Sequence, residues 1–97
     1  MAKFRVISVE ERPDGQLALD IEVFKGSVIS LEERIGHFTI NIPAEKISAV
    51  SGATANDRVA EYEKIIASDP KIQNLVNASI ARSKLESDIK FPFEGNI

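Results

Sequence analysis

The alternation of apolar and other side chains in residues 17–24 constrains the fold of this chain more than any other feature. The apolar set is Leu17, Leu19, Ile21 and Val23, and the alternating set is Ala18, Asp20, Glu22 and Phe24. Successive side chains of a β-strand point to opposite faces of a sheet, so this period of two predicts a strand with one buried face. A partner strand is expected over residues 3–11. The segment Pro13-Asp14-Gly15 favours a three-residue hairpin loop, in which a type I turn ends in a glycine bulge.

This loop predicts a register for the first strand. Val9 would pair with Leu19, and Ile7 with Ile21, on the face that is buried in the core. The opposite face would then carry a second apolar patch made of Phe4, Val6 and Phe24. Such a patch needs a cover, because contiguous apolar surface is rarely left in water.

The rest of the chain divides into further strands and then helices. Strands are expected in residues 28–31 and 38–42, the latter with Phe38, Ile40 and Ile42 on one face. Residues 44–50 are compatible with a short helix or with the end of a strand, because Pro43 suits both. From Thr54 the apolar period becomes helical. Asp69-Pro70 supplies a helix cap and a first-turn proline, so the two helices should form an antiparallel or sharply bent pair.

These segments predict one α+β domain over residues 1–97. An antiparallel sheet of three to four strands occupies residues 1–50, two amphipathic helices occupy 54–87, and an extended tail occupies 88–97. A chain of 97 residues is too short for two independent cores. The tail contains Phe91-Pro92-Phe93, in which two apolar anchors flank a proline that favours an extended path. It should dock on its own domain, where it would cover the predicted patch, or on a neighbouring subunit.

Composition argues against several classes of function. Twelve Lys and Arg residues are scattered along the chain against fifteen Asp and Glu residues, so a cationic surface for nucleic acid is not expected. No stretch approaches the roughly 20 apolar residues of a membrane span, and the first residues lack the apolar core of a signal peptide. The absence of cysteine excludes thiol chemistry and suits a reducing compartment. A cytoplasmic protein without nucleic-acid or membrane partners is therefore expected.

One group of residues could support chemistry. His37 is the only histidine, and Asp20 and Glu22 share a strand face with their carboxylates roughly 6 to 7 Å apart. Together they would give a small hydrolase-like enzyme. Alternating charge on the wet face of a hairpin is, however, the commoner reason for such a pattern. No catalytic, cofactor-binding or metal-binding residue is therefore predicted.

The pattern is most typical of a non-enzymatic structural or assembly protein that self-associates or docks into a larger complex. Its predicted interface residues are Phe4, Val6, Phe24, Phe91 and Phe93. Small structural or assembly proteins of phage and prophage particles fit this profile, although no motif in the chain points to them. The main alternative is a monomeric adaptor or regulator that binds a protein on the helix pair or on the open sheet face.

Overall fold

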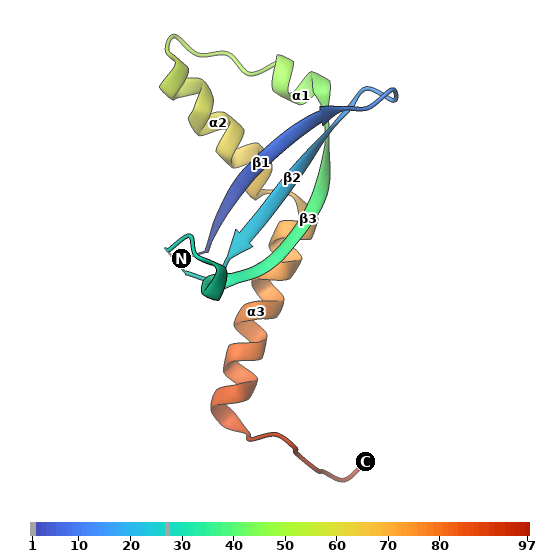
Figure 1. Cartoon of the computed structure of the whole chain (residues 1–97), viewed down its shortest axis with the longest axis vertical. Helices are drawn as coiled ribbons and strands as arrows, with labels where there is room; N and C mark the ends of the chain where they lie inside the picture. The colour runs from blue at the N-terminus through green and yellow to red at the C-terminus, as the bar shows by residue number, and fades with distance from the viewer. Residues whose placement is uncertain (1, 27) are drawn as a thin grey trace.

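The computed structural model describes residues 2–26 and 28–97 (Figure 1). The elements in chain order are β1 (Lys3–Glu11), β2 (Gln16–Phe24), a 3₁₀ turn η1 (Leu31–Glu33), β3 (Arg34–Pro43), α1 (Ala44–Ser48), α2 (Ala55–Ala67) and α3 (Pro70–Asp88). The three strands form one antiparallel sheet in the order β1-β2-β3. The α+β class, with the sheet in the N-terminal half and helices after it, is confirmed.

The hairpin loop between β1 and β2 closes as predicted. The Arg12 N–H donates to the Gln16 carbonyl at 2.9 Å, and the Gly15 N–H donates to the Arg12 carbonyl at 3.1 Å. Gly15 has a φ of 82°, which glycine adopts without steric cost. This loop holds Val9 opposite Leu19, as the sequence predicts.

The register predicted for Ile7 is wrong. The pairing shifts at Ile7, which is the extra residue of a β-bulge, and Val6 takes the place opposite Ile21. Without the bulge, strict alternation would turn Arg5 toward the core. With it, Phe4 packs against the core cluster and Arg5 faces the other side of the sheet. The bulge thus avoids the cost of burying a guanidinium in an apolar core.

The predicted patch of Phe4, Val6 and Phe24 therefore does not form. Phe4 and Val6 lie on the core face, opposite Val23 and Ile21. Phe24 lies on the other face but is only 1% exposed, and the Arg5 guanidinium is 5.6 Å from the centroid of its ring. An arginine over the face of an aromatic ring is a favourable cation–π arrangement. No tail is needed to cover Phe24.

The connection from β2 to β3 also differs from the prediction. Residues 28–31 form no strand and lead instead into η1, while the Lys25 N–H donates to the Glu33 carbonyl at 2.8 Å and closes the loop. Within residues 2–26 and 28–97 the sheet has three strands. After β3, the helical alternative for residues 44–50 is the correct one, because α1 begins directly after Pro43.

The two long helices begin where the sequence predicts. Thr54 caps α2 in a reciprocal pair with Asp57, since each side chain accepts a hydrogen bond from the other residue's backbone N–H. The Asp69 side chain caps α3 by accepting from the Lys71 N–H at 2.9 Å. Helix α3 runs on away from α2 instead of returning beside it (Figure 1), so the pair is bent and not antiparallel.

The core lies where this bend meets the sheet. Ile66, near the end of α2, and Ile72, near the start of α3, pack on the apolar side of β2 and β3. The buried cluster comprises Leu19, Ile21, Val23, Ile40, Ile42, Ile66 and Ile72. It covers only the first part of α3, so the later turns of that helix extend past the sheet (Figure 1).

Helix α3 approaches β3 closely at Gly36. A Cβ atom at this position would overlap Leu75 of α3 and lie 3.1 Å from the Phe38 ring. We expect Gly36→Ala to lower the free energy of unfolding by about 1–3 kcal/mol, as overpacking does in cores. Urea denaturation measures the change. Gly95→Ala, where the nearest atom is 3.8 Å from the added Cβ, is the matched control and should leave stability unchanged. Equal stability of the two variants would contradict this packing.

Candidate functional site

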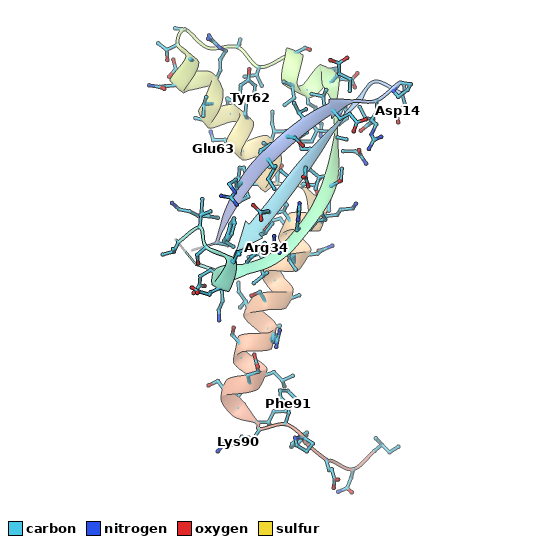
Figure 2. All side chains as sticks on the ribbon, in the orientation of Figure 1. Asp14, Arg34, Tyr62, Glu63, Lys90 and Phe91 are labelled. Carbon is cyan, nitrogen blue, oxygen red and sulfur yellow. The ribbon has the colours of Figure 1, made fainter. Side chains whose placement is uncertain are left out.

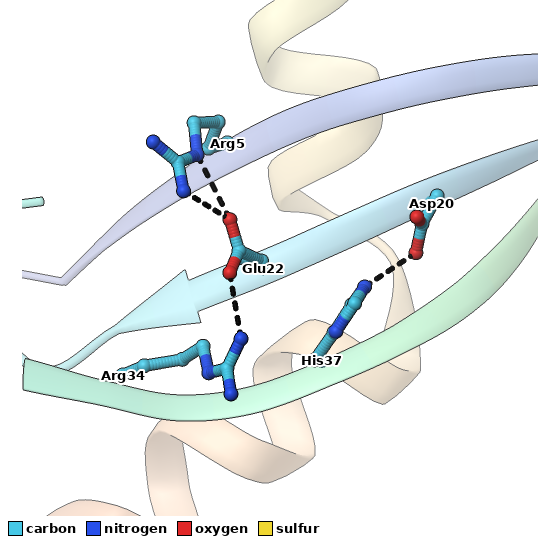
Figure 3. Close-up of polar contacts among 5 residues, drawn as sticks. All are labelled: Arg5, Asp20, Glu22, Arg34 and His37. Atoms are coloured by element: carbon cyan, nitrogen blue, oxygen red, sulfur yellow. Dashed lines mark hydrogen bonds and ion pairs between the residues drawn. The ribbon is translucent and has the colours of Figure 1, made fainter. Parts of the chain in front are cut away.

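The face of the sheet that points away from the core carries a polar cluster drawn from all three strands (Figure 3). Glu22 of β2 lies between two arginines: Arg5 Nε of β1 donates to Glu22 Oε1 at 2.8 Å, and Arg34 Nη1 of β3 donates to Oε2 at 2.8 Å. The Glu22 side chain is 5% exposed beneath them. One carboxylate thus ties the central strand to both of its neighbours.

The two guanidinium groups hold the pKa of Glu22 below its ordinary value. The hydrogen bond from Arg34 has the largest effect, followed by that from Arg5, and burial opposes them with a smaller effect. At neutral pH the carboxylate is therefore ionised, and both of its oxygens accept charge-assisted hydrogen bonds. A carboxylate engaged in this way is a poor general base.

His37 and Asp20 form a separate pair beside this cluster. The His37 Nε2 lies 2.8 Å from Asp20 Oδ1, and both side chains are substantially exposed. The structure therefore brings together two of the three residues considered for a hydrolase-like site, and engages the third, Glu22, elsewhere. Hydrolysis by a histidine–carboxylate pair also needs a nucleophile and oxyanion donors. In the described part of the chain, Asp20 is the one hydrogen-bond partner that the structure gives to the imidazole.

Residues 2–26 and 28–97 also bear on two other kinds of site, a metal centre and a membrane-spanning helix. No group of three or more histidine, aspartate or glutamate side chains there is placed to hold a metal ion. None of the helices in that part combines the length and the apolar surface needed to cross a bilayer.

A second candidate site is apolar and lies at the end of α3. We call residues 80–97 the C-terminal arm. Ile80 is 63% exposed, and Phe91 and Phe93 are 60% and 62% exposed. Figure 2 shows Phe91 beyond the end of the sheet, on the chain that leads away from it. In this structure the tail thus lies free of its own domain and covers neither Phe4 nor Phe24.

A groove runs along the base of this arm. It has a volume of about 300 Å³ and lies between α3 and the start of the sheet. Its lining comprises Ala2, Lys25, Ile35, Val76, Ser79, Ile80 and Ser83. The small side chains of Ser79 and Ser83 leave room where the apolar side of α3 continues past the core. The groove therefore lies at the base of the arm, and Phe91 and Phe93 lie beyond the end of α3.

No protein-family model, curated protein or solved structure matches this chain. Its function is therefore inferred from the geometry of its own residues.

Sequence reasoning missed the arginine pair around Glu22. Arg5 and Arg34 are far apart in the chain, and each reaches Glu22 only because a register shift turns it to the polar face. The available signal was the charge of Glu22 in a strand whose one other charged residue is Asp20. A charge at such a place predicts cross-strand partners of opposite sign, but not which ones.

We expect Glu22→Gln to destabilise the fold at neutral pH, because it removes the charge that both arginines bind. A carboxyl whose pKa is lowered on folding stabilises the folded state above its unfolded pKa of about 4.5, and this stabilisation is lost as the pH falls through the folded value. The variant should therefore show a lower Tm at pH 7 and a weaker loss of stability on acidification below about pH 4.5 than wild type.

Thermal denaturation monitored by circular dichroism between pH 7 and pH 2 measures both effects. Glu11→Gln, at an exposed position of β1, is the matched control and should follow the wild-type curve. A Glu22→Gln variant with the wild-type Tm and the wild-type acid dependence would contradict a structural role for this cluster.

Proposed function

We propose that this chain is a non-enzymatic structural or assembly protein of the cytoplasm, and that it self-associates through its C-terminal arm. The observation that carries the proposal is the exposure of Ile80, Phe91 and Phe93 along the later turns of α3 and the tail. Two phenylalanines on a tail outside the helices and strands supply large apolar area with few rotatable bonds, which suits the centre of a protein interface.

The overall dimensions support this proposal. The accessible surface is 7321 Å², whereas a compact monomer of 10.7 kDa exposes about 5,500 Å². The radius of gyration is 17.0 Å, against about 13 Å for a compact domain of ~100 residues. The chain is thus extended for its size, with α3 and the tail reaching well past the sheet (Figure 1). A second subunit would bury part of it.

The chemistry of the polar face favours an assembly role over an enzymatic one. Glu22 is saturated by two arginines, and the pair of His37 and Asp20 lies on open surface. The net charge of −3 disfavours a polyanionic partner such as nucleic acid. The absence of cysteine is in keeping with the reducing cytoplasm. A protein partner with apolar surface, such as a second copy, suits the arm best.

The tail phenylalanines provide the test. We expect the double variant F91S/F93S to weaken self-association by at least about tenfold, because each buried phenylalanine is worth roughly 1.5–3 kcal/mol of apolar contact. Size-exclusion chromatography with light scattering, over a range of concentrations, measures the mass. A chain cut after Lys90 should behave like the double variant.

The double variant E94S/N96S is the matched control, since it changes two exposed residues of the same tail without removing an apolar anchor. It should keep the wild-type mass. If F91S/F93S also keeps the wild-type mass, self-association through the arm is rejected. A wild-type monomer would favour the adaptor alternative.

A further inference from the structure

Strand β1 is an open edge of the sheet. It is nine residues long and pairs on one side with β2, and within residues 2–26 and 28–97 its backbone makes no hydrogen bond to any other element. It also exposes three β-branched apolar side chains, Val6, Ile7 and Val9, the last to 61%. An unpaired edge with apolar side chains is a template for pairing with another strand.

The other edge of the sheet is different. Helix α3 lies against β3, and the Lys71 ammonium donates to the Thr39 carbonyl at 3.2 Å. Strand β3 ends at Pro43, which has no N–H to offer. Figure 1 shows β1 and β3 at opposite margins of the sheet, with the start of α3 crossing behind β3 and α2 lying alongside β1. In the described part of the chain the backbone of β1 carries neither a bond of this kind nor a proline, so a partner strand is expected at the β1 edge.

The charges along β1 select the orientation of such a partner. The first half of the strand carries Lys3 and Arg5, and the second half carries Glu10 and Glu11. Two copies of β1 running parallel would place like charges side by side, which is unfavourable. Two copies running antiparallel would place the basic half of each beside the acidic half of the other. The edge is thus complementary to itself in the antiparallel orientation.

The bulge at Ile7 makes this pairing consistent on both faces. Val6 and Val9 lie opposite Ile21 and Leu19, so both side chains are on the core face. Arg5 and Glu10 lie opposite residues of the other β2 face, so both are on the polar face. An antiparallel pairing with Val6 of one copy opposite Val9 of the other therefore also places Arg5 opposite Glu10. In a strand without the bulge, residues three or five apart would lie on opposite faces.

The backbone groups agree with the same register. Gln16 accepts from Arg12, so the even-numbered residues of β2 hydrogen-bond to β1. Their partners Arg5 and Glu10 therefore direct their backbone N–H and C=O groups toward β2. The backbone groups of Val6 and Val9 then point away from β2, toward the open edge. Val6 of one copy and Val9 of the other can then exchange both of their hydrogen bonds.

Arg5 can join this contact without leaving Glu22. Its Nε and Nη2 atoms donate to Glu22, and its side chain remains 53% exposed. A guanidinium has five N–H donors, so several remain for a carboxylate from another chain.

We propose that two copies of this chain pair their β1 strands antiparallel about a two-fold axis, with Val6 opposite Val9 and Arg5 opposite Glu10, to form a continuous six-stranded sheet. The inference deepens the proposed assembly function by naming a second copy as the partner of β1. It does not use the C-terminal arm, so the two proposals can fail separately.

Val9→Pro tests the pairing in the full-length F91S/F93S chain, where the arm contact is removed. Proline at this position takes away an outward N–H and spares the hydrogen bonds to β2. We expect F91S/F93S to be a dimer, and its dissociation constant to rise about tenfold or more with Val9→Pro, because two symmetry-related hydrogen bonds are lost. Val9→Thr keeps the branched side chain and the N–H, and should keep the dimer. Circular dichroism establishes that each variant is folded.

Crosslinking gives a second measurement that does not depend on a proline. The chain contains no cysteine, so a single introduced cysteine is the one thiol present. Ser8 lies beside the proposed axis, and a Ser8→Cys chain should form a disulfide-linked dimer on mild oxidation. Lys3→Cys should not, because an antiparallel pair holds the two Lys3 positions roughly 30 Å apart, from a rise of about 3.3 Å per residue.

Each outcome decides one proposal. A monomeric F91S/F93S chain, a dimer unaffected by Val9→Pro, or crosslinking through Lys3→Cys in place of Ser8→Cys would overturn the β1 pairing. If F91S/F93S has a lower mass than wild type and Val9→Pro lowers it no further, the β1 pairing is rejected and the arm contact is kept. If F91S/F93S keeps the wild-type mass and Val9→Pro then lowers it, the arm contact is rejected and the β1 pairing is kept.

Discussion

The rest of the structure depends on the packing of the bend between α2 and α3 against the sheet. Ile66 and Ile72 stand on either side of it and insert into the apolar face of β2 and β3. Because a three-stranded sheet cannot bury its own face, these two helix ends supply the other half of the core. The Asp69 cap fixes where the second helix begins and hence where Ile72 falls. Helix α3 starts at this point and is long enough that its later turns extend past the end of the sheet (Figure 1).

The polar face is organised around Glu22 in a comparable way. A single carboxylate binds guanidinium groups from both neighbouring strands, so the edge strands are held to the centre on the face that points away from the core. Ion pairs at a surface contribute little when isolated, but a shared and nearly buried carboxylate links three strands at once. The same saturation takes from Glu22 the freedom that catalysis would need. Glu22 cannot both bind the two arginines and act on a substrate, and in this structure it binds the arginines.

The parts of the fold that local chemistry determines are predictable from the sequence. The hairpin loop follows from Pro13-Asp14-Gly15, and the start of α3 follows from Asp69-Pro70, since in each case the residues that specify the backbone are adjacent. Strand type for residues 16–24 follows from alternation alone. These signals need no knowledge of what lies across the sheet.

The register of β1 is not predictable in this way. Val6 and Ile7 are both apolar, so either could face the core, and the choice depends on where Arg5 finds a partner. The ring of Phe24 likewise lies against the guanidinium of Arg5, which comes from another strand. Residues 28–31 have the composition of a strand, yet the bond from Lys25 to Glu33 closes the chain directly onto β3. The polar cluster, absent from the sequence-based prediction, follows from these same non-local choices.

The two surfaces proposed for assembly have different consequences for symmetry. A two-fold contact through β1 uses the same patch on both copies and is complete once two chains have joined. Such a dimer still exposes both C-terminal arms, because the later turns of α3 and the tail extend past the end of the sheet (Figure 1). Growth beyond a dimer therefore requires a second contact of a different kind, and Phe91 and Phe93 offer one. A chain with only the edge would stop at two copies, whereas a chain with both surfaces can connect dimers into a larger particle.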